Sequence, residues 1–240
     1  MERQIKVSPN LAALAKETAD VIFASASEAI AGQGKFSIAL SGGRTPEALY
    51  TLLAQEPYRS VIDWAKVQVF FGDERCVPPD SPESNYGMAR RAMLSKVPIP
   101  GDNIYRMRGE IDPNEAAKEY GQMLKEKFGD GGIDLVLLGM GDDGHTASLF
   151  PGTEALNETK HRCVANFVPK LKTWRITLSA PFINQSKRVL ILVAGKEKTQ
   201  RLHEVLEGPR DPQRLPIQLI APVKGQLVWM VDAEAAGMNE

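Results

Sequence analysis

Residues 133–151 have the sequence IDLVLLGMGDDGHTASLFP. The segment begins with an apolar run that includes residues 135–138, a pattern typical of a strand buried on both faces of a sheet. Three glycines then fall within the six residues 139–144, and glycine permits the backbone conformations of a tight turn. His145 follows the turn directly. Because open parallel sheets bind ligands beyond the carboxyl ends of their strands, His145 is predicted to lie at a ligand site.

His145 has the properties of a general base. The ordinary pKa of histidine is close to neutrality, and a carboxylate can orient one ring nitrogen while the other accepts a proton from water. Asp143 is the expected orienting group, and Asp142 is the second choice. The alternative is a helix-capping loop, in which Asp and Thr side chains satisfy backbone N–H groups and the histidine is incidental.

A second strand and turn are predicted near the start of the chain. Residues 36–40 form a short apolar strand, and Pro46 suits the first turn of a helix that continues through Leu53. The segment between this strand and this helix offers bare backbone N–H groups, hydroxyls and a guanidinium. Together with the helix N-terminus, these groups favour binding of an anion. The alternative is a plain turn between strand and helix. The predicted anion-binding residues are Ser41, Gly42, Gly43, Arg44 and Thr45.

A third strand, predicted over residues 64–71, ends in a charged triplet. Arg75 can hold a phosphate or stabilise an oxyanion, and Asp73 can orient a water or a substrate hydroxyl. The alternative is a solvated turn with a local ion pair between these two side chains. Ser84 and Asn85 are predicted to cap a helix that ends at Leu94.

The remaining pattern predicts an α/β protein with a Rossmann-like, three-layer α/β/α fold. Strands alternate with helices, the sheet is expected to be mostly parallel, and no Ser/Thr/Gly-rich linker divides the chain. We expect a single compact domain over residues 1–240, with its motifs between about residues 10 and 232. The other predicted helices span 10–31, 113–128 and 197–206, and the other predicted strands span 163–168, 174–179, 188–193, 216–220 and 227–231.

Composition excludes several classes of protein. The net charge of −1 gives no indication of nucleic-acid or membrane binding. Cys76 and Cys163 form neither a metal-ligand pattern nor a disulfide framework, and no His/Cys/carboxylate cluster has metal-ligand spacing. The polar residues 1–6 lack the apolar segment of a signal peptide, and no apolar run approaches the length of a membrane span. We expect a cytoplasmic monomer or small homo-oligomer that needs no metal or cofactor.

Together these strand ends suit a small phosphorylated substrate that undergoes proton transfer or attack by water. The chain lacks the Gly-x-Ser-x-Gly elbow of acyl-serine enzymes, and neither cysteine has the surroundings of a nucleophile. Direct attack by water is therefore expected. The candidate cations for phosphate or oxyanion are Arg44, Arg75, Arg175 and Lys198.

Five motifs occur in order along the chain: SGGRTP at 41–46, FGDER at 71–75 with SNY at 84–86, GMGDDGHTASLFP at 139–151, RITL at 175–178 and GKEK at 195–198. In combination, these motifs resemble the 6-phosphogluconolactonase family over nearly the whole chain. The related glucosamine-6-phosphate deaminases are less similar: they usually continue Asp-Gly-His with Ile-Ala-Phe-Asn-Glu and have Asp-Glu-Tyr at residues 73–75.

The resemblance implies hydrolysis of 6-phospho-D-glucono-1,5-lactone to 6-phospho-D-gluconate in the oxidative pentose phosphate pathway. It implies that His145, oriented by Asp143, activates water, and that Arg75 faces the oxyanion or the phosphate, with help from the backbone N–H groups of Gly42 and Gly43. Arg175 and Lys198 match positions that the superfamily uses for the 6-phosphate. A helix starting at Glu197 would turn only one of Lys196 and Lys198 inward, and the family position favours Lys198.

Three other functions remain open at this point. A deaminase or isomerase of hexosamine 6-phosphate would use Asp73 as its proton-transfer base. A sugar-phosphate sensor would bind without turnover, and such sensors usually carry an added DNA-binding domain. A structural relative without activity is disfavoured by the intact set of His145, Asp143 and Arg75.

Overall fold

Two sheets form the framework of the computed structural model, which describes residues 4–238. The larger sheet has six parallel strands in the order β1-β9-β8-β5-β2-β3. The smaller sheet has three antiparallel strands in the order β4-β7-β6. The strands are β1 (Gln4–Ser8), β2 (Phe36–Leu40), β3 (Val67–Phe71), β4 (Asp73–Arg75), β5 (Leu135–Gly139), β6 (Cys163–Val168), β7 (Thr173–Leu178), β8 (Arg188–Val193) and β9 (Gln226–Asp232).

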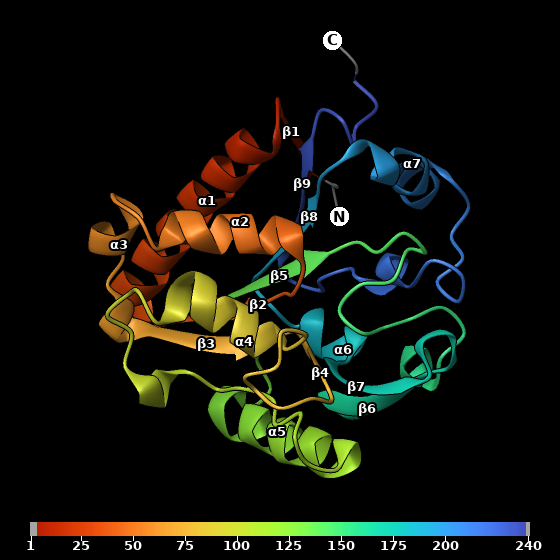
Figure 1. Cartoon of the computed structure of the whole chain (residues 1–240), viewed down its shortest axis with the longest axis horizontal. Coiled ribbons are helices and arrows are strands. Elements are labelled where there is room, and N and C mark those ends of the chain that lie inside the picture. Colours follow the sequence, from red (N-terminus) through yellow and green to blue (C-terminus); the bar gives the residue numbers. More distant parts are fainter. Residues whose placement is uncertain (1–3, 239–240) are drawn as a thin grey trace.

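Helices cover both faces of the six-stranded sheet (Figure 1). Alternate side chains of β5 point to opposite faces: Val136 and Leu138 belong to one buried cluster with α5, whereas Leu135 and Leu137 belong to another with α1 and α2. The predicted three-layer α/β/α fold with a mostly parallel sheet is thereby confirmed. The helices are α1 (Leu11–Gln33), α2 (Arg44–Leu53), α3 (Tyr58–Val61), α4 (Asn85–Ala89), α5 (Pro113–Phe128), α6 (Ala180–Ile183) and α7 (Thr199–Glu207).

Local capping explains why several predicted boundaries are confirmed. The Asn10 side chain accepts a hydrogen bond from the backbone of Ala13 and starts α1, while Asp112 caps α5 in the same way. Ser84 accepts from Gly87 and starts α4, which continues as a π-helical turn over Arg90–Leu94. These are interactions between near neighbours in the chain, so the sequence alone indicates them.

Three predictions of local structure are wrong, and one strand was missed. Residues 64–66 form a 3₁₀ turn, and β3 begins at Val67. Pro216–Leu219 is also a 3₁₀ turn. Pro216 has no N–H for a strand ladder, and Ile217 donates its N–H to the carbonyl of Gly144. The helix predicted from residue 197 begins at Thr199, after a 3₁₀ turn over Lys196–Lys198. The edge strand β1 was not predicted; residues 1–3 of the polar N-terminal segment lie outside the described residues.

The smaller sheet was not predicted, because β4 consists of three charged residues that resemble a turn. In the structure β4 pairs antiparallel with β7, and the register places Asp73 opposite Thr177 and Arg75 opposite Arg175. This pairing joins segments that are about 100 residues apart in the chain, so no local pattern indicates it.

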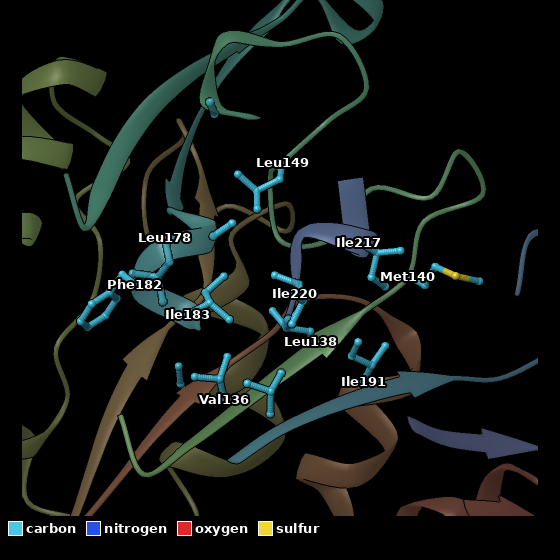
Figure 2. Packing of buried hydrophobic residues seen from close by; sticks show 14 of the residues in the cluster. Val136, Leu138, Met140, Leu149, Leu178, Phe182, Ile183, Ile191, Ile217 and Ile220 are labelled. Atoms are coloured by element: carbon cyan, nitrogen blue, oxygen red, sulfur yellow. The ribbon is translucent and has the colours of Figure 1, made fainter. Parts of the chain in front are cut away.

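Apolar packing fixes the strand that leads into the loop with His145. Figure 2 shows Val136 and Leu138 of β5 among side chains from later elements, including Ile183 of α6 and Ile220. All four of these side chains are buried. The loop after β5 therefore starts from a rigid position. Within residues 4–238, no helix is both long and apolar enough to span a membrane.

Candidate active site

A pocket of about 370 Å³ opens where the ends of β2 and β5 meet the smaller sheet. It has the size and position expected of a ligand site in an α/β protein. Among the predicted site residues, Arg44, Thr45 and Lys198 lie outside its lining. Those that line it are Ser41, Gly42, Gly43, Asp73, Arg75, Asp143, His145 and Arg175.

His145 and Asp143 form a short hydrogen-bonded pair at this pocket. Nδ1 of His145 lies 2.6 Å from Oδ1 of Asp143, which also accepts the backbone N–H of His145 at 3.2 Å. Burial acts to raise the pKa of Asp143, but the hydrogen bond to His145 and the ion pair with Lys170 outweigh it and hold that pKa well below its ordinary value. Asp143 is thus an ionised acceptor, so Nδ1 carries the hydrogen and Nε2 is the nitrogen that can accept a proton.

The imidazole ring is held between two neighbours. It stacks on Phe150 with a centroid separation of 4.0 Å and an interplanar angle of 20°. On the backbone of Gly141, a Cβ atom would lie 2.1 Å from Nδ1 and Cε1 of the ring, a separation that atoms do not tolerate. Glycine at position 141 is therefore required for the ring to take this orientation.

The turn that carries His145 is held by hydrogen bonds at two points. Gly144, at φ +78°, accepts a hydrogen bond from Ile217 at 3.0 Å. The hydroxyl of Thr146 donates to the carbonyl of Gly139 at 2.8 Å. The segment leads into no helix before the 3₁₀ turn Glu154–Asn157, so the helix-capping alternative for this loop is wrong.

Asp73 and Glu74 are buried structural anchors rather than parts of a solvated turn, and that alternative is wrong. Asp73 is 7% exposed and accepts hydrogen bonds from Ser148 at 2.6 Å and Asn85 at 3.1 Å. Burial raises the pKa of Glu74, and hydrogen bonds from Ser84 and from the backbone of residues 75, 85 and 86 oppose that rise. The two carboxyl groups connect β4 to α4 and to the loop after β5.

Arg75 and Arg175 bring two positive charges to the pocket from adjacent strands. They are directly opposite each other in the β4–β7 register, and both line the pocket. Burial lowers the pKa of Arg175, and the positive charge of Arg75 lowers it further. Because like charges directly opposite on a sheet repel each other, an anion between them would relieve the repulsion. This pair is therefore suited to bind phosphate.

The glycine loop after β2 also lines the pocket. A Cβ atom at Gly42 would lie 2.0 Å from Oδ1 of Asn85, and Gly43 has φ +104°, so both positions favour glycine. Arg44 is exposed and begins α2, with Thr45 after it. The loop thus presents its backbone to the pocket, whereas the guanidinium predicted to bind an anion belongs to the outer surface.

Lys198 is paired with Asp142, the first aspartate of the loop. Its Nζ forms an ion pair with Oδ1 of Asp142, and the two side chains are 19% and 80% exposed. Lys196 is exposed, so Lys198 is the lysine that turns inward. Asp142 therefore contacts Lys198, while Asp143 orients the histidine. In residues 4–238, no group of three or more His, Cys, Asp or Glu side chains has an arrangement that could hold a metal ion.

Three residues of the site were missed by sequence reasoning. Phe150 stacks on His145, Asn85 holds Asp73, and Nζ of Lys170 lies 3.0 Å from Oδ2 of Asp143. Asn85 had been predicted only as a helix cap. Lys170 lies in the short connection between the strands predicted at 163–168 and 174–179, and this position was the only sign of it in the sequence. The contact of Lys170 with Asp143, 27 positions earlier, depends on tertiary structure.

Comparison with known proteins agrees with this geometry. The family model described as glucosamine-6-phosphate isomerases/6-phosphogluconolactonase matches residues 9–229. The 6-phosphogluconolactonase of Nostoc sp. is 41% identical over 241 residues, and the match covers 98% of each chain. The structure of 6-phosphogluconolactonase from Trypanosoma brucei is 31% identical, with a TM-score of 0.87 and 98% of each chain covered.

A monomeric glucosamine-6-phosphate deaminase is also similar, with a TM-score of 0.82 over 98% of this chain and 100% of that chain. Its identity is only 21%, so this likeness shows a shared fold and nothing more. The chain belongs to the family of glucosamine-6-phosphate isomerases and 6-phosphogluconolactonases.

Proposed function

We propose that the chain hydrolyses 6-phospho-D-glucono-1,5-lactone to 6-phospho-D-gluconate, in the cytoplasm and as part of the oxidative pentose phosphate pathway. One observation carries the proposal: a single pocket joins a histidine–carboxylate pair to a pair of arginines. The first pair suits proton transfer, and the second suits a phosphate. The Nostoc and Trypanosoma brucei relatives, named 6-phosphogluconolactonase, support the same substrate.

The first step is attack by water. Asp143 accepts the Nδ1 hydrogen of His145, so Nε2 takes a proton from a water molecule in the pocket. The water oxygen forms a bond to C1 of the lactone, and the carbonyl oxygen becomes an oxyanion. The positive charge that develops on the imidazole is stabilised by the ionised Asp143 beside it.

The second step opens the ring. The oxyanion re-forms its double bond, and the bond between C1 and the ring oxygen breaks. His145 gives its proton to the departing ring oxygen, which becomes a hydroxyl, and the new carboxylic acid loses its proton to solvent. Gly42 and Gly43 line the same pocket, and we assign the oxyanion to their backbone N–H groups.

The phosphate is assigned to the arginine pair. Arg75 and Arg175 present several N–H donors, and guanidinium groups bind phosphate oxygens in a bidentate manner. Lys198 contributes from the rim if it leaves Asp142, so its effect on substrate affinity is expected to be smaller. Asp73 keeps its role in holding the loop, because its oxygens already accept hydrogen bonds from Ser148 and Asn85.

The test is a coupled assay with freshly generated lactone. Glucose-6-phosphate dehydrogenase supplies the lactone, and formation of 6-phosphogluconate is followed through its dehydrogenase against the spontaneous rate. Acceleration by the wild type, and none by the matched His145→Gln variant, is the expected result. Ammonia release from glucosamine 6-phosphate, with no acceleration of lactone hydrolysis, would instead show the deaminase reaction and overturn the proposal.

A further inference from the structure

The connection between β6 and β7 crosses the pocket next to the catalytic pair. Its 3₁₀ turn, Pro169–Leu171, contributes Lys170 and Leu171 to the pocket lining. Nζ of Lys170 lies 3.0 Å from Oδ2 of Asp143, and the two side chains are 69% and 23% exposed. A cation from the smaller sheet thus contacts the carboxylate that orients the base on the larger one.

The two oxygens of Asp143 have different partners. Oδ1 accepts from the ring and the backbone of His145, whereas Oδ2 accepts from Lys170. A carboxylate held at both oxygens cannot rotate about its Cβ–Cγ bond without breaking one of these contacts. We propose that Lys170 is a positioning residue that holds Asp143 toward His145 and weakens the affinity of the imidazole for a proton. This inference rests on the proposed lactone hydrolysis.

Electrostatics gives the direction of the effect. Asp143 favours the protonated imidazole, and the ammonium beside it offsets part of that attraction. Without Lys170, Oδ1 of Asp143 still accepts hydrogen bonds from the backbone and the ring of His145, so the carboxylate stays beside the ring. Its negative charge is then no longer offset by the ammonium, and the imidazolium becomes more stable. A base that holds its proton more tightly is neutral over a narrower range of pH.

The other charged groups near the pair form their own partnerships. Asp142 is paired with Lys198, and Arg201 of α7 donates to the backbone carbonyl of Asp142 and pairs with Glu204. Asp73 is held by Ser148 and Asn85. The arginines at 75 and 175 line the same pocket. Of the described residues, Lys170 is the lysine in contact with Asp143, so its removal should change the pair more than removal of a neighbouring cation.

The first experiment measures kcat/KM against pH for the wild type and for Lys170→Met. The acid limb of the pH profile should lie about 0.5–1 pH unit higher in the variant than in the wild type. The shift is expected to be small because solvent screens the charge of the exposed lysine. The KM for the lactone should change little. Lys172→Met is the matched control, since Lys172 is exposed two positions along the same connection, and it should keep the wild-type profile. Lys170→Arg should restore most of the profile.

An unmoved acid limb in Lys170→Met would overturn the inference. A rise in KM without a shift of the limb would overturn it as well, because it would make Lys170 a substrate-binding residue. A merely structural role would lower activity at every pH and leave the limb in place.

A second measurement is independent of turnover. The protein has three histidines, so NMR titration of their ring signals can follow His145, with His161 and His203 as internal references and His145→Gln for assignment. The His145 midpoint should rise in Lys170→Met by the same amount, and the references should not move. An unchanged His145 midpoint would contradict the inference, whether or not the wild type hydrolyses the lactone. An inactive wild type would count against the proposed function alone.

Discussion

The two sheets contribute to the pocket in different ways. The six-stranded parallel sheet contributes loops that follow its strands: the glycine loop after β2 and the turn after β5 that carries His145. The three-stranded antiparallel sheet contributes side chains from within its strands and from one connection: Arg75, Arg175 and Lys170.

This difference separates the chemistry into two parts. The group to which we assign proton transfer, His145, is positioned by contacts within a short loop, since Gly141, Asp143 and Phe150 are close to it in sequence. The cations are positioned by the register between distant strands. We therefore expect changes in the loop to affect kcat, and changes in the smaller sheet to affect KM or the pH profile.

Replacement of His145 should have the largest effect. His145→Gln removes the general base and should lower kcat by about 10²–10⁴-fold, with little change in KM. Steady-state kinetics in the coupled assay measures both values, and a thermal melt checks that the variant is folded. A kcat near that of the wild type would remove His145 from the mechanism.

Loss of one arginine should come next. Arg175→Met removes charged hydrogen bonds to the phosphate and should raise KM by about 10–100-fold, while kcat stays within a few-fold of the wild type. Initial rates at increasing lactone concentration measure the change. Lys172→Met, a change of cation on the connection next to β7, is the control and should leave KM unaltered. A fall in kcat alone would contradict the assignment of Arg175 to the phosphate.

Gly141→Ala should have a smaller effect that is confined to the base. The added methyl group would overlap the imidazole and push it from its place between Gly141 and Phe150. A fall in kcat of about tenfold is expected, because small displacements of a catalytic group are costly. Calorimetric binding of 6-phosphogluconate should remain close to that of the wild type. If binding were lost and kcat kept, the separation between the two sheets would be wrong.

The smallest expected effect concerns stability at low pH. The folded protein holds the pKa of Asp143 below its ordinary value of 3.8, so ionisation of Asp143 stabilises the fold above that value. This contribution disappears as the pH falls through 3.8 toward the folded pKa. Urea unfolding should show the wild type more stable than Asp143→Asn at about pH 5, with the difference shrinking by about pH 3. A difference that grows as the pH falls would contradict the sign.

The sequence indicated the parts of the fold that depend on near neighbours. The strand Phe36–Leu40, the helix Pro113–Phe128 and its cap Asp112 all follow from local apolar spacing and capping. Asp143 and His145 are two positions apart, so the sequence also indicated their contact.

The features that the sequence could not indicate depend on contacts between segments far apart in the chain. Asp73–Arg75 has the composition of a turn, yet it is a buried strand because β7 supplies its partner. The ion pair between Lys170 and Asp143 requires the β6–β7 connection to cross the pocket. Arg44 lies in a motif that suits an anion, but it is the first residue of α2 and its side chain is exposed on the surface.

The most direct test of the division between the two sheets uses a lactone without a phosphate. The kcat/KM of the wild type, His145→Gln and Arg175→Met would be measured on both glucono-1,5-lactone and its 6-phosphate. We expect His145→Gln to lose activity on both substrates, and Arg175→Met to lose activity on the phosphorylated lactone while matching the wild type on the other. Equal losses for Arg175→Met on both lactones would contradict the account, because the arginine pair would then not recognise the phosphate.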